Sequence, residues 1–487
     1  MALMTLGDLI GPQAKLPAPL LRLPIKGLAS DSRAVKPGYL FAALPGTATN
    51  GARFIAEAVQ RGAVAILVAP GSAPADLATP IVEDDDPRRL LALIAARFFA
   101  TQPKTVMAVT GTNGKTSVAA FLRQLWSERG LAAASLGTVG IVGPNGAQPL
   151  LHTTPDPIEL HRILARLASE GVTHAAIEAS SHGLQQRRLD GVRLAAGAFT
   201  NISRDHLDYH ASFEDYFAQK LRLFRELLPQ GATAVVEVDS EAGMQVAAEA
   251  ASRGLNVVSV GRAGKTLRLV SAESDGFGQH LVIEHAGAKY DVRLPLVGHF
   301  QAANALVAAG LALAGGEEIA GDVLPLLARL RGARGRLDLA GSARGGAPIF
   351  IDYAHTPDAL AKALEALRPY VTGRLTVVFG CGGDRDRGKR PQMGAVAAAQ
   401  ADRVIVTDDN PRSEDAAAIR RQILAAASGA EEIGDRAAAI RHAIAGLEEG
   451  DVLLVAGKGH ETGQTIGATV VPFSDHDAVS IALQEVA

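Results

Sequence analysis

The chain alternates short apolar runs with longer amphipathic stretches over most of its length. Runs of this length, separated by segments with helical periodicity, favour a mostly parallel sheet flanked by helices. The pattern is clearest in the middle of the chain. Expected strands there cover residues 105–109, 173–179, 195–200, 232–238 and 257–260, and a helix is expected over 213–228.

Two other patterns flank this central one. Residues 267–271, 280–284 and 290–294 alternate apolar and polar positions, which predicts an antiparallel edge. Farther on, four apolar runs each end in polar or glycine-rich residues. They predict a Rossmann-like doubly wound domain whose ligands lie at the carboxyl ends of the strands. These runs are residues 349–353, 375–379, 404–407 and 452–456.

The first hundred residues predict a smaller α/β domain, with helices at 54–60 and 90–99 and strands at 63–68 and 79–82. A break at Thr101-Gln-Pro103 and a basic, glycine-interrupted stretch at 331–336 mark the domain boundaries. We therefore expect an α/β protein of three domains. They are residues 1–101, residues 102–332 with a phosphate-loop type of sheet, and residues 333–487.

Composition narrows the class of protein. The chain of 487 residues is 48% hydrophobic and has a formal net charge of −3, which favours neither a nucleic-acid partner nor a membrane surface. Cys381 is the single cysteine, so an intrachain disulfide is excluded. Neither a signal peptide nor an apolar run of about 18 residues is evident. A cytoplasmic protein without a membrane span is expected.

The strongest chemical signal follows the expected strand at 105–109. A tight glycine turn leads from it into an expected helix, the order of a phosphate-binding loop. Standard loops of this kind have glycine six residues before the lysine, where this chain has Val109, so the loop is a variant. The expected nucleotide-binding residues are Gly111, Thr112, Asn113, Gly114, Lys115, Thr116 and Ser117.

Four other sites are candidates, and three of them each allow two interpretations. Glu178, near the end of a strand, is a magnesium ligand or a solvated carboxylate. His206, within residues 201–210, binds a metal or phosphate or caps a turn; zinc is disfavoured because no cysteine is nearby. Lys220 on a helix is ordinarily a solvated charge. Asp408-Asp-Asn-Pro-Arg412 is a turn, or its arginine and Arg385 form a site for a ligand carboxylate.

Taken together, these motifs resemble the Mur ligase family, ATP-dependent enzymes that add amino acids to a cell-wall precursor. The resemblance runs nearly end to end and keeps the family's order. It rests on Thr-Gly-Thr-Asn-Gly-Lys-Thr (110–116), Glu-x-Ser-Ser-His-Gly-Leu (178–184), Asp-His-Leu-Asp-Tyr-His (205–210), Asp-Tyr-Ala-His-Thr-Pro-Asp-Ala-Leu (352–360) and Asp-Asn-Pro-Arg (409–412).

The resemblance implies a reaction and a set of small-molecule substrates. A carboxylate of UDP-N-acetylmuramoyl-L-alanyl-D-glutamate is activated by ATP as an acyl phosphate and then joined to meso-2,6-diaminopimelate, in peptidoglycan precursor synthesis. Mg²⁺ is the implied cofactor, and a monomer is expected. Lys115, Glu178, His206 and Lys220 are the implied catalytic residues. Thr116, Glu178, His206 and a carbamylated Lys220 are the implied metal ligands.

The resemblance also implies binding residues in each domain. The nucleotide would further contact Asn304, Arg336, Asp352 and His355. The uridine part of the precursor would contact Ser30, Ser32, Thr47, Ala48 and Thr49, and its dipeptide part Thr153, Thr154, Ser180, Gln186 and Arg188. Diaminopimelate would contact Arg385, Asp409, Asn410, Pro411, Arg412, Gly457 and Glu461.

The chain departs from the family pattern at His152, at Gln301 and at residues 47–49, which puts individual contacts in question. Three alternatives stay open. The same ligase could use L-lysine, or the chain could be a folylpolyglutamate-type ligase. A non-catalytic nucleotide switch is the third. Arg412 favours diaminopimelate over lysine, because only the former offers a distal carboxylate.

Overall fold

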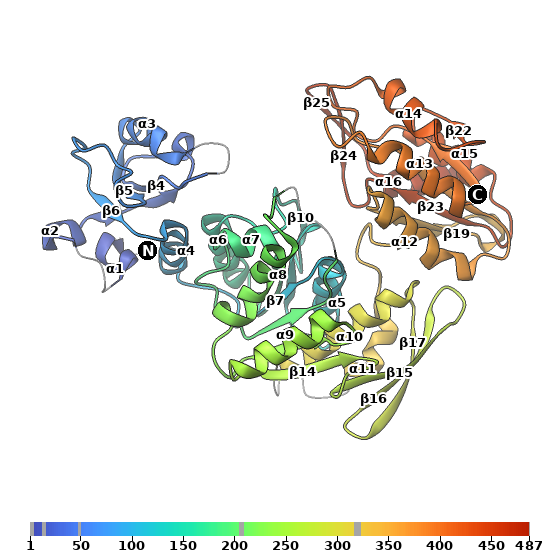
Figure 1. The fold of residues 1–487 in the computed structure, drawn as a ribbon, viewed down its shortest axis with the longest axis horizontal. Coiled ribbons are helices and arrows are strands. Elements are labelled where there is room, and N and C mark those ends of the chain that lie inside the picture. The colour runs from blue at the N-terminus through green and yellow to red at the C-terminus, as the bar shows by residue number, and fades with distance from the viewer. Residues whose placement is uncertain (1–3, 12–15, 47–49, 204–208, 316–322, 487) are drawn as a thin grey trace. The chain divides into compact units, whose positions relative to one another are not determined.

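The computed structural model describes residues 4–11, 16–46, 50–203, 209–315 and 323–486 (Figure 1). The chain divides into two compact units, Met1–Ser259 with Gly310–Ala320 and Val260–Ala309 with Gly321–Ala487. This division is coarser than the three expected domains, whose boundaries stay predictions. The mixed α/β class is confirmed.

The first unit begins with a small parallel sheet covered by helices. Its strands, in spatial order, are β3 (Gly27–Ala29), β4 (Tyr39–Ala42), β5 (Ala63–Val68) and β6 (Ile81–Glu83). Leu6 and Leu91 share one core, and Ile55 and Ala58 belong to another. Around the sheet lie α1 (Leu6–Ile10), α2 (Ala18–Leu21), α3 (Ile55–Gln60), α4 (Pro87–Phe99) and the short pair β1 (Met4–Thr5) and β2 (Pro24–Ile25).

Helix α4 begins three residues before its expected start. The Asp86 side chain accepts a hydrogen bond from the Arg89 amide at 3.1 Å, and Pro87 occupies the first helical position. A capping carboxylate followed by proline is a strong start signal, which the apolar periodicity alone did not reveal.

A second, mostly parallel sheet follows in the same unit and confirms the central prediction. Strand β7 is buried along its whole length, as expected for a central strand covered on both faces. The strand order is β10 (Gly146–Gln148), β9 (Gly140–Gly143), β8 (Ala133–Gly137), β11 (His174–Glu178), β7 (Thr105–Thr110), β12 (Ala196–Phe199), β13 (Thr233–Glu237) and β14 (Asn256–Gly261). The helices are α5 (Lys115–Glu128), α6 (Pro157–Ser169), α7 (Ser181–Gln185), α8 (Phe213–Arg222) and α9 (Glu241–Ser252).

The single helix expected over 213–228 is wrong in its second half. Helix α8 ends at Arg222 and continues as a π-helical turn, η3 (Leu223–Leu227), closed by the Leu228 amide on the Leu223 carbonyl at 3.0 Å. The wider turn keeps Leu223, Phe224 and Leu228 together in the core. π-Helical turns often lie near functional sites.

The second unit contains the expected antiparallel strands β15 (Leu267–Ser274), β16 (Gln279–His285) and β17 (Ala288–Leu294). Helix α10 (His299–Ala314) begins in this unit, and α11 (Val323–Leu326) belongs to it.

The last sheet is the expected doubly wound one. Alternate residues of one strand enter different cores: Val377 and Phe379 belong to one, and Val378 to the other. Helices α12 (Pro357–Leu367), α13 (Lys389–Gln400) and α14 (Ala416–Leu424) cover the first face, and α15 (Arg436–Ala445) and α16 (Asp475–Val486) the second. The strand order is β18 (Asp338–Ser342), β19 (Pro348–Asp352), β23 (Val452–Ala456), β20 (Leu375–Phe379), β21 (Arg403–Val406) and β22 (Glu431–Glu432).

Strand β18 is antiparallel and all the others are parallel, so the carboxyl ends of β19, β20, β21 and β23 meet at one edge. A hairpin of β24 (Gly463–Ile466) and β25 (Thr469–Pro472) follows β23. Among the described residues, no helix is long and apolar enough to cross a membrane.

Candidate active site

The phosphate loop joins the end of β7 to the start of α5. Gly111 and Gly114 have φ values of +146° and +85°, which favour glycine. A Cβ atom on Gly111 would lie 2.0 Å from Thr200 Oγ1, so the loop closes tightly against the end of β12. The Thr112 and Asn113 amides donate to the main-chain and side-chain oxygens of Asn201 at 2.8 and 3.0 Å.

Two lysines from different helices meet at this loop. Lys115 Nζ donates to the Gly111 and Thr112 carbonyls at 2.9 and 2.8 Å, and Lys220 Nζ donates to the same Gly111 carbonyl at 2.7 Å. Lys220 is buried and lies over the Tyr216 ring, 4.3 Å from its centroid. The interpretation of Lys220 as a solvated helix charge is therefore wrong.

Glu178 joins the end of β11 to the phosphate loop. Its buried carboxylate accepts hydrogen bonds from Thr116 Oγ1 at 3.1 Å, the Thr138 amide at 2.8 Å and Thr138 Oγ1 at 3.2 Å. The interpretation as a solvated carboxylate is therefore also wrong. A Cβ atom on Gly137 would lie only 2.0 Å from Glu178 Oε1, so the carboxylate needs a glycine beside it.

The expected dipeptide-binding residues form one connected group next to Glu178. Thr154 Oγ1 donates to the Glu178 carbonyl at 2.7 Å and lies 3.0 Å from Ser180 Oγ, which caps α7. Arg188 donates to Gln186 Oε1 and to the Thr154 carbonyl. Thr153 also belongs to this group, because its hydroxyl lies 3.1 Å from Thr138 Oγ1.

The expected uridine-binding residues are only partly described. Ser30 is exposed at the end of β3, and the buried Ser32 hydroxyl donates to Glu57 Oε2 at 2.7 Å. Thr47, Ala48 and Thr49 lie outside the described residues, and so does His206.

In the second unit, the expected nucleotide contacts lie on α10, at the end of β19 and in the loops before β18 and after β19. Asn304 is buried on α10 and donates to Gln301 Oε1 at 3.0 Å. The Asp352 carboxylate, at the end of β19, accepts the Leu337 and Ala354 amides, each at 2.7 Å. Arg336 stacks on Tyr353, 5.0 Å from its ring centroid, and the Tyr353 ring lies 4.6 Å from that of His355.

The expected diaminopimelate residues gather at the carboxyl edge of the doubly wound sheet. The Asn410 side chain donates to Glu461 at 2.9 Å, and a Cβ atom on Gly457 would lie 2.9 Å from Asp409 Oδ2. Pro411 is buried. Arg385 is exposed and is not drawn into this hydrogen-bonded group.

Arg412 is held in an unusual backbone conformation with φ +51°. Its amide donates to the Thr465 carbonyl at 3.0 Å, and its own carbonyl accepts the Gly467 amide at 2.7 Å, so the β24–β25 hairpin fixes it. Its Nη1 donates to the Gly383 carbonyl at 2.8 Å. A non-glycine residue with positive φ, held from both sides, is a frequent sign of a functional position.

Sequence reasoning missed three residues of these sites. Thr138 binds Glu178 twice, and the Tyr216 hydroxyl lies 3.0 Å from Thr112 Oγ1. Lys458 is fully buried and donates to Asn410 Oδ1 at 3.1 Å and Glu461 Oε2 at 3.0 Å. Of these three residues, only Lys458 could have been selected from the sequence, because it lies between two glycines directly after a buried strand.

The described residues contain no cluster of three or more histidine, cysteine, aspartate or glutamate side chains suited to a metal. The Thr116 hydroxyl and Glu178 carboxylate nevertheless bond to each other beside the phosphate loop. Hydroxyl and carboxylate oxygens are the ligands that Mg²⁺ uses together with substrate phosphates. These two residues therefore fit a magnesium ion bound with a nucleotide.

Three sequence profiles match the chain in succession. They describe the Mur ligase family catalytic domain (residues 24–99), the Mur ligase middle domain (109–312) and the Mur ligase glutamate ligase domain (335–459). The chain belongs to the Mur ligase family. The resemblance inferred from the motifs is thus confirmed.

Individual Mur ligases match over the full length. The UDP-N-acetylmuramoyl-L-alanyl-D-glutamate–2,6-diaminopimelate ligase of Bradyrhizobium diazoefficiens is 58% identical over 99% of both chains. The ligase of the same name from Brucella melitensis is 55% identical over 94% of both chains. A solved structure of a ligase with this name is 31% identical, covers 99% of both chains and superimposes with a TM-score of 0.73.

Substitution of Gly137 should test the Glu178 arrangement. In Gly137→Ala the new methyl group would displace the carboxylate from Thr116 and Thr138. We expect ATP turnover to fall about 100-fold, which corresponds to roughly 3 kcal/mol of transition-state stabilisation.

The matched control is Gly143→Ala on the neighbouring strand β9, where a Cβ atom would meet only Ala134 Cβ at 3.5 Å. Turnover and Tm should both stay near the parent values. Equal turnover in the two variants would contradict the role of the Glu178 contacts.

Proposed function

We propose that the chain is an ATP-dependent ligase that joins meso-2,6-diaminopimelate to UDP-N-acetylmuramoyl-L-alanyl-D-glutamate. The observation that carries the proposal is the pairing of Glu178 with Thr116 beside Lys115, because it combines a phosphate loop with an acidic strand end. The proposed substrates are those named for relatives that are more than 50% identical over at least 94% of the chain. The product belongs to peptidoglycan precursor synthesis in the cytoplasm, and the enzyme acts as a monomer.

The reaction has two chemical steps. A glutamate carboxylate oxygen of the precursor first attacks the γ-phosphorus of ATP, so that ADP leaves and an acyl phosphate forms. The amine of diaminopimelate then attacks the acyl carbon, and phosphate leaves as the amide forms. Lys115 turns from the loop carbonyls toward the nucleotide and spreads the charge that develops on the phosphoryl group.

Mg²⁺ neutralises charge on the transferred phosphoryl group when it is bound. Thr116 and Glu178 are its proposed ligands, together with His206 and a carbamate on Lys220. A carbamate nitrogen keeps one N–H, so the bond from Lys220 to the Gly111 carbonyl is compatible with the modification. The added carboxylate would turn a cationic side chain into an anionic ligand.

Arg412 is proposed to determine the specificity for the amino-acid substrate. Its guanidinium is anchored at one end by Gly383, and the remaining donors suit a carboxylate. Lysine lacks this carboxylate and would leave the arginine unpaired, which costs about 1.5–3 kcal/mol. The same ligase acting on L-lysine is therefore the less favoured alternative. A folylpolyglutamate-type ligase is disfavoured by the family match over residues 24–99.

A phosphate-release assay over a panel of amino acids tests the proposal. We expect turnover only with the UDP-muramoyl dipeptide present, and a kcat/KM for meso-diaminopimelate at least 10-fold above that for L-lysine. Arg412→Ala should raise KM for diaminopimelate about 10- to 100-fold and leave KM for ATP nearly unchanged.

The exposed Arg421, 3.7 Å from Asp415, supplies the matched control Arg421→Ala, which should behave as the parent. Comparable kcat/KM for L-lysine in the parent would contradict the assignment of diaminopimelate. Turnover without the uridine precursor would contradict the whole proposal.

Lys220→Ala tests the carbamate. The variant should lose nearly all turnover, because the loop loses a buried donor and a metal ligand together. Acetate should restore part of the activity by supplying the missing carboxylate, and ammonium chloride should not. Rescue by ammonium instead of acetate, or parental activity in the variant, would refute the carbamate role.

A further inference from the structure

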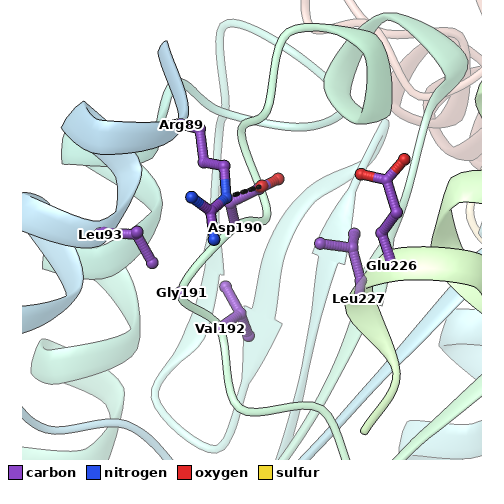
Figure 2. A pocket seen from close by; sticks show the side chains of 7 residues that line it. All are labelled: Arg89, Leu93, Asp190, Gly191, Val192, Glu226 and Leu227. Atoms are coloured by element: carbon purple, nitrogen blue, oxygen red, sulfur yellow. Dashed lines mark ion pairs between the residues drawn. The ribbon is translucent and has the colours of Figure 1, made fainter. Parts of the chain in front are cut away.

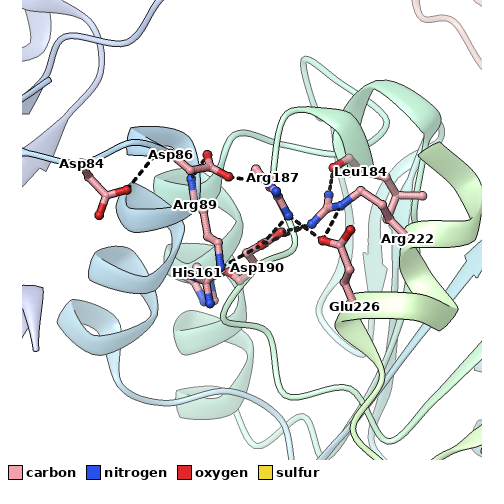
Figure 3. A network of polar contacts seen from close by, with 9 residues as sticks. All are labelled: Asp84, Asp86, Arg89, His161, Leu184, Arg187, Asp190, Arg222 and Glu226. Atoms are coloured by element: carbon pink, nitrogen blue, oxygen red, sulfur yellow. Dashed lines mark hydrogen bonds and ion pairs between the residues drawn. The ribbon is translucent and has the colours of Figure 1, made fainter. Parts of the chain in front are cut away.

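A chain of ion pairs crosses the first unit from α4 to α8 and η3 (Figure 3). Asp86 is the residue that caps α4, and its Oδ2 lies 2.9 Å from Arg187 Nε. Arg187 Nη1 donates to Glu226 Oε2 at 2.6 Å, and Arg222 Nε donates to the same oxygen at 2.9 Å. Arg222 Nη2 completes the chain on Asp190 at 3.2 Å. Figure 3 shows these side chains converging from separate elements on the turn after α7.

The inner end of the chain is buried. The side chains of Arg222 and Asp190 are 9% and 7% exposed, so each charge requires compensation by the opposite charges around it. Arg222 also donates to the Leu184 carbonyl, at the end of α7. Burial lowers the pKa of His161, whose Nε2 lies 3.3 Å from the Asp190 carbonyl, to about 4, so this ring adds no charge near neutral pH.

The outer end of this chain of ion pairs holds a strained turn in place. Arg187 has φ +60°, and Gly191 has φ +85° in a position where a Cβ atom would lie 2.7 Å from Ala96 Cβ of α4. Gln186 and Arg188 flank Arg187 and bond to each other. In this turn, the proposed precursor-binding residues Gln186 and Arg188 therefore flank Arg187, which is paired with the cap of α4.

A cavity of about 380 Å³ lies beside this chain (Figure 2). It separates Leu93 of α4 from Leu227 of η3, and across it Arg89 and Asp190 approach only to 4.0 Å. Beside the cavity, the Asp86–Arg187 pair joins the start of α4 to the turn after α7, next to the close approach of Gly191 to Ala96. Elsewhere Ile158 of α6 packs against the core that contains α4.

We propose that Arg187 is a positioning residue that, through Asp86, sets the small sheet bearing Ser30 and Ser32 relative to Gln186 and Arg188. The inference rests on the proposed function, because one precursor would have to contact both places. A ligand held at two points gains affinity only when their separation matches its own length. An ion pair that limits this separation in the free protein therefore reduces the conformational entropy that is lost when the ligand binds.

The test compares the whole precursor with its two halves. In Arg187→Met and, separately, in Asp86→Asn, KM for the UDP-muramoyl dipeptide should rise about 5- to 10-fold, while KM for ATP and for the amino acid stays within about twofold. The Kd of UDP alone and that of the muramoyl dipeptide lacking UDP should stay within about twofold of the parent values. The double variant should be no worse than Arg187→Met alone, because Arg187→Met already removes the Asp86–Arg187 pair together with the bond to Glu226.

Arg225→Met is the matched control. It breaks the Arg225–Glu249 pair on the same π-helical turn, outside the chain of ion pairs, and KM for the precursor should stay at the parent value. Two results overturn the inference: an unchanged KM for the whole precursor in both single variants, or fragment affinities that fall as much as the affinity for the whole. Failure of the parent protein to bind the precursor would instead refute the proposed function.

Discussion

The buried carboxylate of Glu178 is the interaction on which the central site depends. It lies at the end of β11 beside β7, the strand that leads into the phosphate loop, and receives hydrogen bonds from both Thr116 and Thr138. A buried charge of this kind is stable only when its hydrogen bonds are satisfied. These hydrogen bonds connect Glu178 to the phosphate loop and to the end of β8. Thr154 connects it to the dipeptide-binding group.

A second buried charge organises the carboxyl edge of the doubly wound sheet. Lys458 bridges Asn410 and Glu461, and thereby links the loops after β21 and β23. Asn410 Oδ1 also accepts the Thr465 amide, so the same group reaches the β24–β25 hairpin that holds Arg412. In both units a buried ionic side chain joins loops that are far apart in sequence, and the proposed ligand-binding residues surround it.

Much of this architecture could be predicted from the sequence. The apolar runs located β7, β11, β12, β13 and, in the last sheet, β19, β20, β21 and β23, because buried parallel strands are nearly continuous in hydrophobicity. Strands β8, β9 and β10 escaped notice, since their small residues and glycines carry no such signal. The π-helical turn after Arg222 was missed as well, because its apolar spacing reads as an ordinary helix.

The candidate residues were predicted more completely than their contacts. Lys220 looked like any lysine on a helix, and only the fold brings it to the Gly111 carbonyl from 109 positions away. Thr138 was missed because its importance comes from Glu178, a partner 40 positions away in the chain. Arg187 was passed over for the same reason, although its neighbours Gln186 and Arg188 were both selected.

The central claim is that the site activates a carboxylate by transferring a phosphoryl group to it. The most direct measurement uses a precursor labelled with ¹⁸O at both oxygens of the reacting glutamate carboxylate and follows the label into inorganic phosphate during one complete turnover with diaminopimelate. An acyl phosphate predicts one ¹⁸O atom in each phosphate released, because the bridging oxygen leaves with phosphorus when the amine attacks carbon. Amide formation with unlabelled phosphate would contradict the account.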